Sequence, residues 1–171
     1  GSSDLSASGQ TVLATAAASN GGTSGGIIMQ TGKAIVGDTG DVRVSTGLSG
    51  GATSGSIAIA VGDGKDGPGG SILVSAGDTT STTGGSVIIR SGRGSATSSG
   101  HLSMKTANAG SSGSSGSLEV VTGEATGGSS GSLDIGTGNA VGGESGDIRI
   151  AVGAGSEGIG GSLIMKSGAS E

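Results

Sequence analysis

One repeated unit runs through almost the whole chain and constrains its fold more than any other feature. The unit reads Gly-Ser-[Leu/Ile/Val]-x-[Ile/Val/Met]-x-[Thr/Val/Ser]-Gly, and successive copies begin 15 residues apart, or 16 in two places. Collagen is excluded because its glycines recur every third residue, and disordered low-complexity sequence would not keep this register. The opening glycine recurs at Gly9, Gly25, Gly40, Gly55, Gly70, Gly85, Gly100, Gly116, Gly131, Gly146 and Gly161.

Within the unit, aliphatic side chains alternate with side chains of mixed polarity. The third and fifth positions are aliphatic in nearly every copy, as in Ile57 with Ile59 and Ile148 with Ile150. Alternation with a period of two is typical of a strand with one buried face. A short strand bounded by glycines and repeated every 15 residues predicts an all-β protein, a β-solenoid (β-helix) of about eleven rungs. At ~4.8 Å between rungs, the rod would be on the order of 50 Å long.

The other half of each unit contains few side chains larger than threonine or valine. Typical stretches are LSGGATS at 48–54, DTTSTTG at 78–84 and EATGGSS at 124–130. Glycine makes up 42 of the 171 residues, and the chain has no aromatic residue. Small residues allow two strands to approach closely. We therefore expect a thin, flattened cross-section with two faces, the aliphatic column lying inside.

We expect residues 1–8 to form a flexible N-terminal lead and residues 9–171 to form a single continuous solenoid domain. A longer repeat is also present, because residues 40–77 and 131–168 share matched details at an offset of 91 residues. This offset indicates that a block of several units was duplicated.

The sequence offers little that could support catalysis or a bound cofactor. A G-x-G-x-x-G pattern at 62–67 would bind a dinucleotide only if a helix began there, and another strand pattern follows instead. His101 is the only histidine, and there is no cysteine to complete a metal site or a nucleophile–base pair. We expect no catalytic, cofactor or metal site, so the chain is interpreted as a protein that is not an enzyme.

Charge and hydropathy also limit the partners. The formal net charge of −5 disfavours nucleic acid, whose binding depends on neutralising phosphates. The longest apolar run is far shorter than the ~20 residues needed to span a bilayer, so no membrane is expected. An uncapped solenoid end is an open template, which leaves a homodimer through a face or an end rung as an alternative.

The small-residue half suggests a binding surface. A flat, weakly charged ladder of hydroxyl side chains repeating at ~4.8 Å could order water and match an ice lattice. The alternative is that small residues are present only to let the coil close. The candidate ice-binding or surface-binding residues are Thr53, Thr80, Thr82, Ser95, Thr97, Thr126 and Ser129.

The G-S-[LI]-x-[IV]-x-T-G unit, together with the A-V-G-x-G-x-x-G-x-G-G-S variant at 60–71 and 151–162, resembles known repeat proteins. These are the Gly/Ser/Thr-rich, 15-residue-repeat proteins of cold-water algae, such as prasinophytes and diatoms, and of their viruses. The resemblance covers about residues 25–168. It implies a β-solenoid fold; some members of the group are described as ice-binding, and others look like surface or fibre components.

From these features we expect a rigid, non-enzymatic repeat protein that acts through a flat surface. The leading hypothesis is ice binding, as an antifreeze or an inhibitor of ice recrystallisation, through the small Ser/Thr/Ala/Gly face. The alternative is an extracellular structural, adhesive or virion-fibre module, and carbohydrate binding comes third. The expected partner is ice, ordered water or an extended polymer surface. Either function implies a secreted or surface location.

Overall fold

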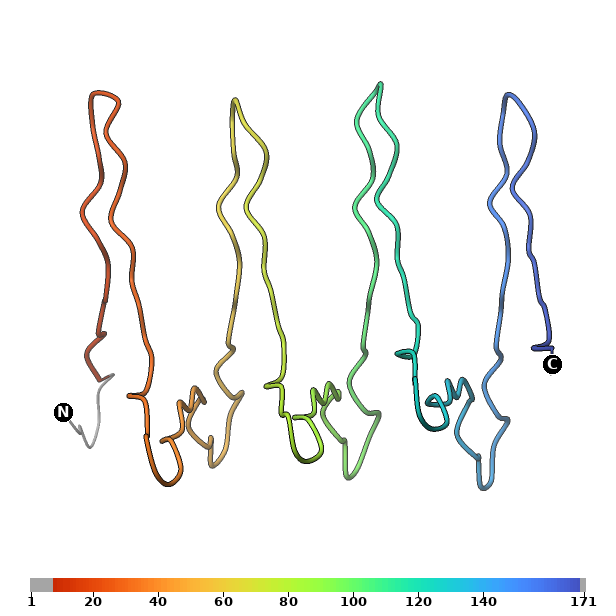
Figure 1. Ribbon diagram of the computed structural model, residues 1–171, viewed down its shortest axis with the longest axis horizontal. Helices are drawn as coiled ribbons and strands as arrows, with labels where there is room; N and C mark the ends of the chain where they lie inside the picture. Colours follow the sequence, from red (N-terminus) through yellow and green to blue (C-terminus); the bar gives the residue numbers. More distant parts are fainter. Residues whose placement is uncertain (1–7, 170–171) are drawn as a thin grey trace. The chain divides into compact units, whose positions relative to one another are not determined.

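The computed structural model describes residues 8–169 of the chain, and within this range it contains no helix and no β-strand. Extended runs alternate with bends instead (Figure 1). The prediction of an all-β protein is therefore wrong, and so is that of a β-solenoid or β-helix. No part of the described chain forms a helix long and apolar enough to cross a membrane.

The 15-residue period is nevertheless present in the backbone, as one bend in each repeat. Each bend is two or three residues long, and most lie 15 residues from the next. A solenoid rung must turn at least twice to bring the chain back above its starting point. A single reversal instead sends consecutive extended runs in opposite directions, as Figure 1 shows for the narrow loops. The bends lie at 20–21, 35–37, 50–52, 65–67, 80–82, 95–97, 111–113, 126–128, 141–143 and 156–158.

Each bend belongs to a loop whose two ends meet in the same way in successive repeats. The opening glycine of one unit lies against the seventh residue of the unit before it. A Cβ built on Gly55 would lie 3.4 Å from Thr46 Cγ2, and one built on Gly70 would lie 2.7 Å from Val61 Cγ1. In two loops the backbone also bonds: Gly85 N–H donates to Gly77 O, and Gly100 N–H donates to Gly92 O, both at 2.9 Å.

The first bend shows how sequence determines a reversal. Asn20 and Gly21 both have positive φ, 58° and 80°, and Gly22 N–H donates to Ser19 O at 3.3 Å. Asn-Gly is the preferred pair for two consecutive left-handed residues in a tight turn, because asparagine tolerates this region and glycine has no Cβ. A local sequence signal therefore accounts for this bend.

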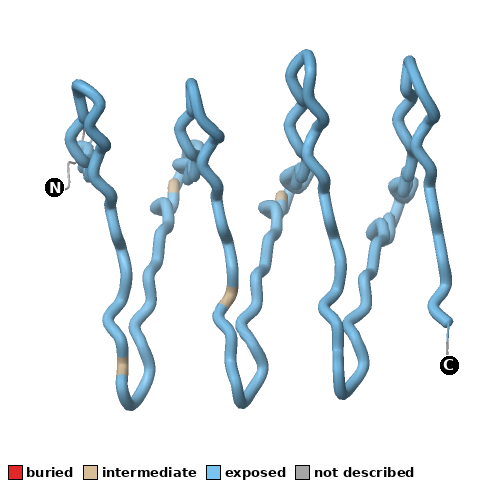
Figure 2. Tube along the Cα trace, turned by 45° about the horizontal axis from the view of Figure 1, so that its top comes forward, coloured by how far each residue is buried: buried red, intermediate tan, exposed pale blue. Residues whose placement is uncertain are grey.

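No described residue is buried, so the structure has no hydrophobic core there. Third-position side chains are 51–60% exposed, from Ile27 to Leu118, and fifth-position ones are 58–82% exposed, from Val120 to Met165. Large aliphatic side chains at the fourth position, between them, are 71–88% exposed, so the alternation predicted from the sequence persists only as a small difference. Figure 2 accordingly shows an almost wholly exposed chain. The half-buried exceptions among the described residues are Ala34, Ser49, Ala76 and Gly94.

The expected inward column of aliphatic side chains is therefore absent, and the accessible surface shows the consequence. The chain exposes 17088 Å². A compact monomer of 15.5 kDa exposes about 7,200 Å², and a fully extended chain of that mass exposes about 22,500 Å². The exposed surface is therefore nearer to that of an unfolded chain than to that of a globular domain.

The chain divides into two units, Gly1–Val87 and Ile88–Glu171. A single continuous domain over 9–171 stays a prediction. The predicted lead at 1–8 falls almost entirely outside the described residues. Two loops 91 residues apart are closed by the same contact. A Cβ on Gly70 would meet Val61 Cγ1 at 2.7 Å, and one on Gly161 would meet Val152 Cγ1 at 2.9 Å. The two copies of the duplicated block therefore share this loop-closing contact, although Gly158 has positive φ, 84°, and its counterpart Gly67 does not.

Candidate functional surface

The seven Ser and Thr residues predicted as a binding face are all exposed, and each lies in a bend or next to one. Within the first unit, Thr53 follows the bend at 50–52, and Thr80 and Thr82 share the bend at 80–82. In the second unit, the bend at 95–97 holds Ser95 and Thr97, the bend at 126–128 holds Thr126, and Ser129 follows it.

These residues come together only as local pairs. The flat face was expected because stacked rungs would align one hydroxyl above another at the sheet spacing. Since the described residues form no sheet, no ladder of strands aligns Thr97 with Thr126 or Glu119 with Asp134. The prediction of a flat, two-faced surface is corrected to a set of separate exposed bends.

The bend at 80–82 is organised by Thr79, a residue that the sequence reasoning missed. Thr79 Oγ1 accepts from the backbone N–H groups of Ser81 and Thr82, each at 3.3 Å, and lies 3.2 Å from Thr82 Oγ1. Ser49 plays the same part in its own bend, because its Oγ accepts from Ala52 N–H at 3.1 Å. A hydroxyl side chain just before a turn is the signal that could have identified both residues.

A tight backbone approach shapes the bend at 95–97. A Cβ placed on Gly94 would overlap the carbonyl oxygens of Ser98 and Thr97. Only glycine fits this position without moving the backbone. The backbone path through this bend therefore depends on a glycine at position 94.

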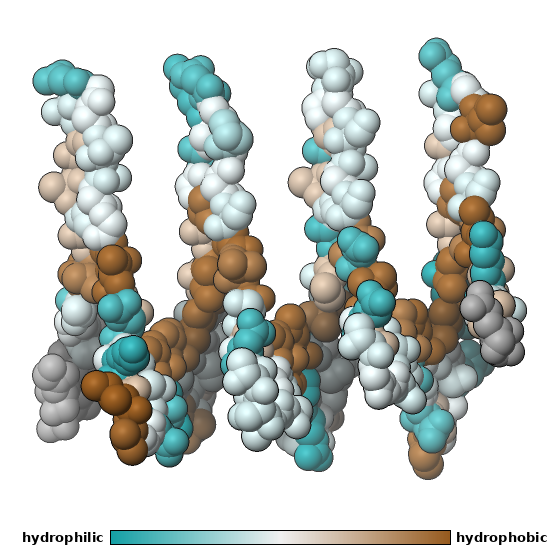
Figure 3. Space-filling view, viewed as in Figure 1, coloured by the Kyte–Doolittle hydropathy of each residue, from teal (hydrophilic) through white to brown (hydrophobic). Residues whose placement is uncertain are grey.

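The second surface consists of aliphatic side chains that were predicted to be internal. The third to fifth residues of each unit, which we call the aliphatic segments, carry most of the exposed large hydrophobic side chains. On the face drawn in Figure 3, such side chains gather along the extended runs, and most loop tips carry paler or hydrophilic ones. The aliphatic segments are 11–13, 27–29, 42–44, 57–59, 72–74, 87–89, 102–104, 118–120, 133–135, 148–150 and 163–165.

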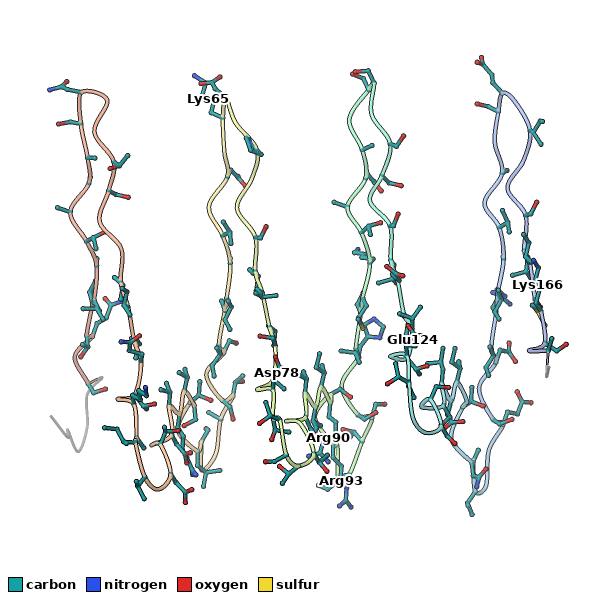
Figure 4. All side chains as sticks on the ribbon, viewed as in Figure 1. Lys65, Asp78, Arg90, Arg93, Glu124 and Lys166 are labelled. Atoms are coloured by element: carbon teal, nitrogen blue, oxygen red, sulfur yellow. The ribbon has the colours of Figure 1, made fainter. Side chains whose placement is uncertain are left out.

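Charged side chains are scattered over the chain and are of both signs. Arg43 Nη2 donates to Asp41 Oδ2 at 2.9 Å, which places residues i and i+2 on one side of an extended run. Both side chains are at least 70% exposed, so this ion pair adds little stability. Figure 4 shows Lys65 at a loop tip, and Arg90 and Arg93 close together in the other unit.

The residues considered for catalysis or ligand binding do not form an enclosed site in the described part of the chain. Residues 62–67 lead into the bend at 65–67, and no helix follows them. His101 is exposed. No cavity is found, and no group of three or more His, Asp or Glu side chains in the described range could hold a metal ion. What the chain presents is therefore a repeated surface.

Comparisons with family models, with curated proteins and with solved structures gave no match for the chain. Its function is therefore inferred from the exposed bends and the aliphatic segments themselves.

Proposed function

We propose that the chain is a non-enzymatic repeat protein that acts as an extracellular structural or adhesive module on an extended polymer surface. One observation carries this proposal: no described residue is buried, and successive repeats present the same exposed bend and aliphatic segment. A chain of this kind binds through many weak contacts. A single enclosed site is not required.

Energetics support a role that depends on contact with a partner. Ordering a residue costs roughly 1–2 kcal/mol of backbone entropy, and glycine loses the most. Burial of apolar area normally offsets this cost, and no described residue is buried. An external surface can supply the missing burial, and ten similar bends would bind it cooperatively because each contact raises the effective concentration of the next.

The chemistry of the bends suits a hydroxyl-rich polymer. Thr80, Thr97 and Thr126 are exposed and can both donate and accept hydrogen bonds. The neighbouring aliphatic segments offer apolar contact to the carbon–hydrogen faces of such a polymer. A polysaccharide fibre combines both kinds of surface, so insoluble cellulose and chitin are suitable probes.

The test is depletion of the purified chain from solution by cellulose and chitin particles. We expect adsorption, weakened severalfold in a variant with Thr80, Thr97 and Thr126 changed to Ala. The matched control changes Ser71, Ser86 and Ser117 to Ala; these residues precede aliphatic segments, and their replacement should leave adsorption unchanged. Absence of adsorption to either polymer, or equal loss in both variants, would contradict the proposal.

Ice binding is the second candidate, and it is supported by the exposure of all seven predicted hydroxyl side chains in bends or next to them. We expect thermal hysteresis and altered crystal shape, and we expect Thr97→Tyr with Thr126→Tyr to abolish both. The control variant, Arg43→Tyr with Arg149→Tyr, changes charged residues outside the bends and should leave both effects unchanged. Unchanged crystal growth at sub-millimolar protein would reject ice binding, whatever the result with polysaccharides.

A further inference from the structure

We propose that the aliphatic segments are covered by a second copy of the same chain, which pairs with them segment to segment and in antiparallel orientation. This inference rests on the proposed structural function and names a second copy of the chain as the partner of the aliphatic segments. Four observations carry it: unpaired backbone, exposed apolar area, repetition of the same segment, and the order of charges within two of the segments.

The backbone of the aliphatic segments has hydrogen-bonding groups without backbone partners. In residues 8–169, backbone-to-backbone bonds join only Gly22 to Ser19, Gly85 to Gly77 and Gly100 to Gly92, all in loops. The segments between them are extended and rich in Ile and Val. Such a row of unpaired N–H and C=O groups is a template for another extended chain.

The exposed area is far more than one interface requires. The chain exposes about 10,000 Å² beyond the surface of a compact protein of its mass. A stable interface needs about 800 Å² from each partner. Side chains such as Ile59, 78% exposed, and Met165, 82% exposed, would lose contact with water on pairing. Several segments could therefore pair at once.

Repetition makes a copy of this chain a suitable partner. Every aliphatic segment has nearly the same pattern, so each has eleven similar segments to pair with on a second copy. The regular spacing between segments means that one pairing brings neighbouring segments close to partners of their own. A partner of unrelated sequence could pair with one segment, but it would lack a second segment at the spacing needed to pair with the next.

The charges favour antiparallel pairing. If the segment at 42–44 pairs with its own copy about Val42, Asp41 of each chain lies opposite Arg43 of the other. Asp147 and Arg149 have the same arrangement about Ile148. Parallel pairing in register would instead place each arginine beside its own copy, and like charges directly opposite are destabilising. The two exposed ion pairs between Asp41 and Arg43, one in each chain, can thus be exchanged for two pairs between chains.

The test is sedimentation velocity of the full chain from about 1 μM to about 1 mM, with the infrared amide I band measured on the same samples. We expect association that increases with concentration, together with growth of the band of paired extended backbone. A chain that remains monomeric with an unchanged amide I band over this range would overturn the inference.

Two matched variants locate the contact. The first changes Ile59, Ile89 and Ile135 to Lys, within aliphatic segments; the second changes Ile35, Val141 and Ile159 to Lys, at or beside bends, where exposure is 92–102%. Lysine on an open edge opposes pairing. We expect the segment variant to require at least about tenfold more protein to associate, and the bend variant to stay within about twofold of the original chain. An equal effect in both variants would show nonspecific apolar association and overturn the inference.

Adsorption to cellulose or chitin separates this inference from the proposed function. A chain that adsorbs but never associates contradicts the pairing of copies and leaves the adhesive function standing. A chain that associates through its aliphatic segments but adsorbs to neither polymer supports the pairing and contradicts the adhesive function.

Discussion

At the scale of single residues, the closure of the loops depends on glycine at particular positions. Gly70 and Gly161 close equivalent loops against Val61 and Val152, with room for hydrogen but not for a methyl group. Gly69, one residue earlier, has nothing within 4 Å of the position that a Cβ would occupy. Adjacent glycines in one loop are therefore not equivalent, and the repeat distinguishes them, because Gly70 opens a unit and Gly69 does not.

Gly70→Ala should open this loop, because the new Cβ would lie 2.7 Å from Val61 Cγ1. We expect loss of the nuclear Overhauser effect between residue 70 and the Val61 methyl groups, and shifted resonances over 61–70. Adding Val61→Ala should restore the resonances of the rest of the loop, since it removes the obstructing methyl. Gly69→Ala serves as the control, and equal perturbation by both glycine variants would contradict the loop geometry.

At the scale of elements, the sequence predicted the 15-residue period at which bends recur, but its prediction that the segments pair within the chain was wrong. Bends are local: Asn20 and Gly21 specify theirs through their own backbone preferences. The number of reversals in a repeat does not follow from its glycines in the same way. The stretch 62–70 contains five glycines, but only residues 65–67 form a bend. A solenoid would need a second reversal. Strand pairing also depends on distant residues, which alternation within one segment does not specify.

For the candidate binding surface too, features of single residues were easier to predict than the arrangement of distant residues. Thr80, Thr97 and Thr126 are exposed, but so is nearly every described residue, and their role in binding stays a prediction. Their alignment on one face was inferred from stacking, and it failed when stacking failed. The aliphatic segments were overlooked as a surface because period-two apolar residues normally face a core.

Antiparallel pairing of the segments predicts a specific response to charge. Arg43→Asp with Arg149→Asp places like charges opposite each other, and we expect association to weaken severalfold. Adding Asp41→Arg and Asp147→Arg to this variant puts opposite charges opposite each other again and should restore association. Sedimentation velocity measures both variants.

The control for this experiment is Arg90→Asp with Arg93→Asp, which lowers the net charge by the same amount without reversing an Asp-x-Arg pair. We expect this control to weaken association less than Arg43→Asp with Arg149→Asp does. If both arginine pairs weaken association equally, overall charge repulsion explains the result and the antiparallel register is wrong.

At the scale of the whole molecule, the absence of a core in the described residues has a thermal consequence. Unfolding a compact domain of this length raises the heat capacity by about 2–2.6 kcal/mol/K. A dilute chain with no buried residue has little apolar area left to expose. Differential scanning calorimetry below the associating concentration should therefore show no cooperative peak. A sharp transition with the heat-capacity change of a globular domain would contradict this prediction.

The most direct measurement of the central claim is backbone amide hydrogen exchange, followed repeat by repeat in dilute and in concentrated solution. The claim is that each repeat is an extended segment and a single bend, unpaired within the chain and paired only between copies. We predict fast exchange in every aliphatic segment of the dilute chain, and slow exchange in the same segments on association. Slow exchange recurring in every repeat of the dilute monomer would show pairing within one chain and would contradict the account.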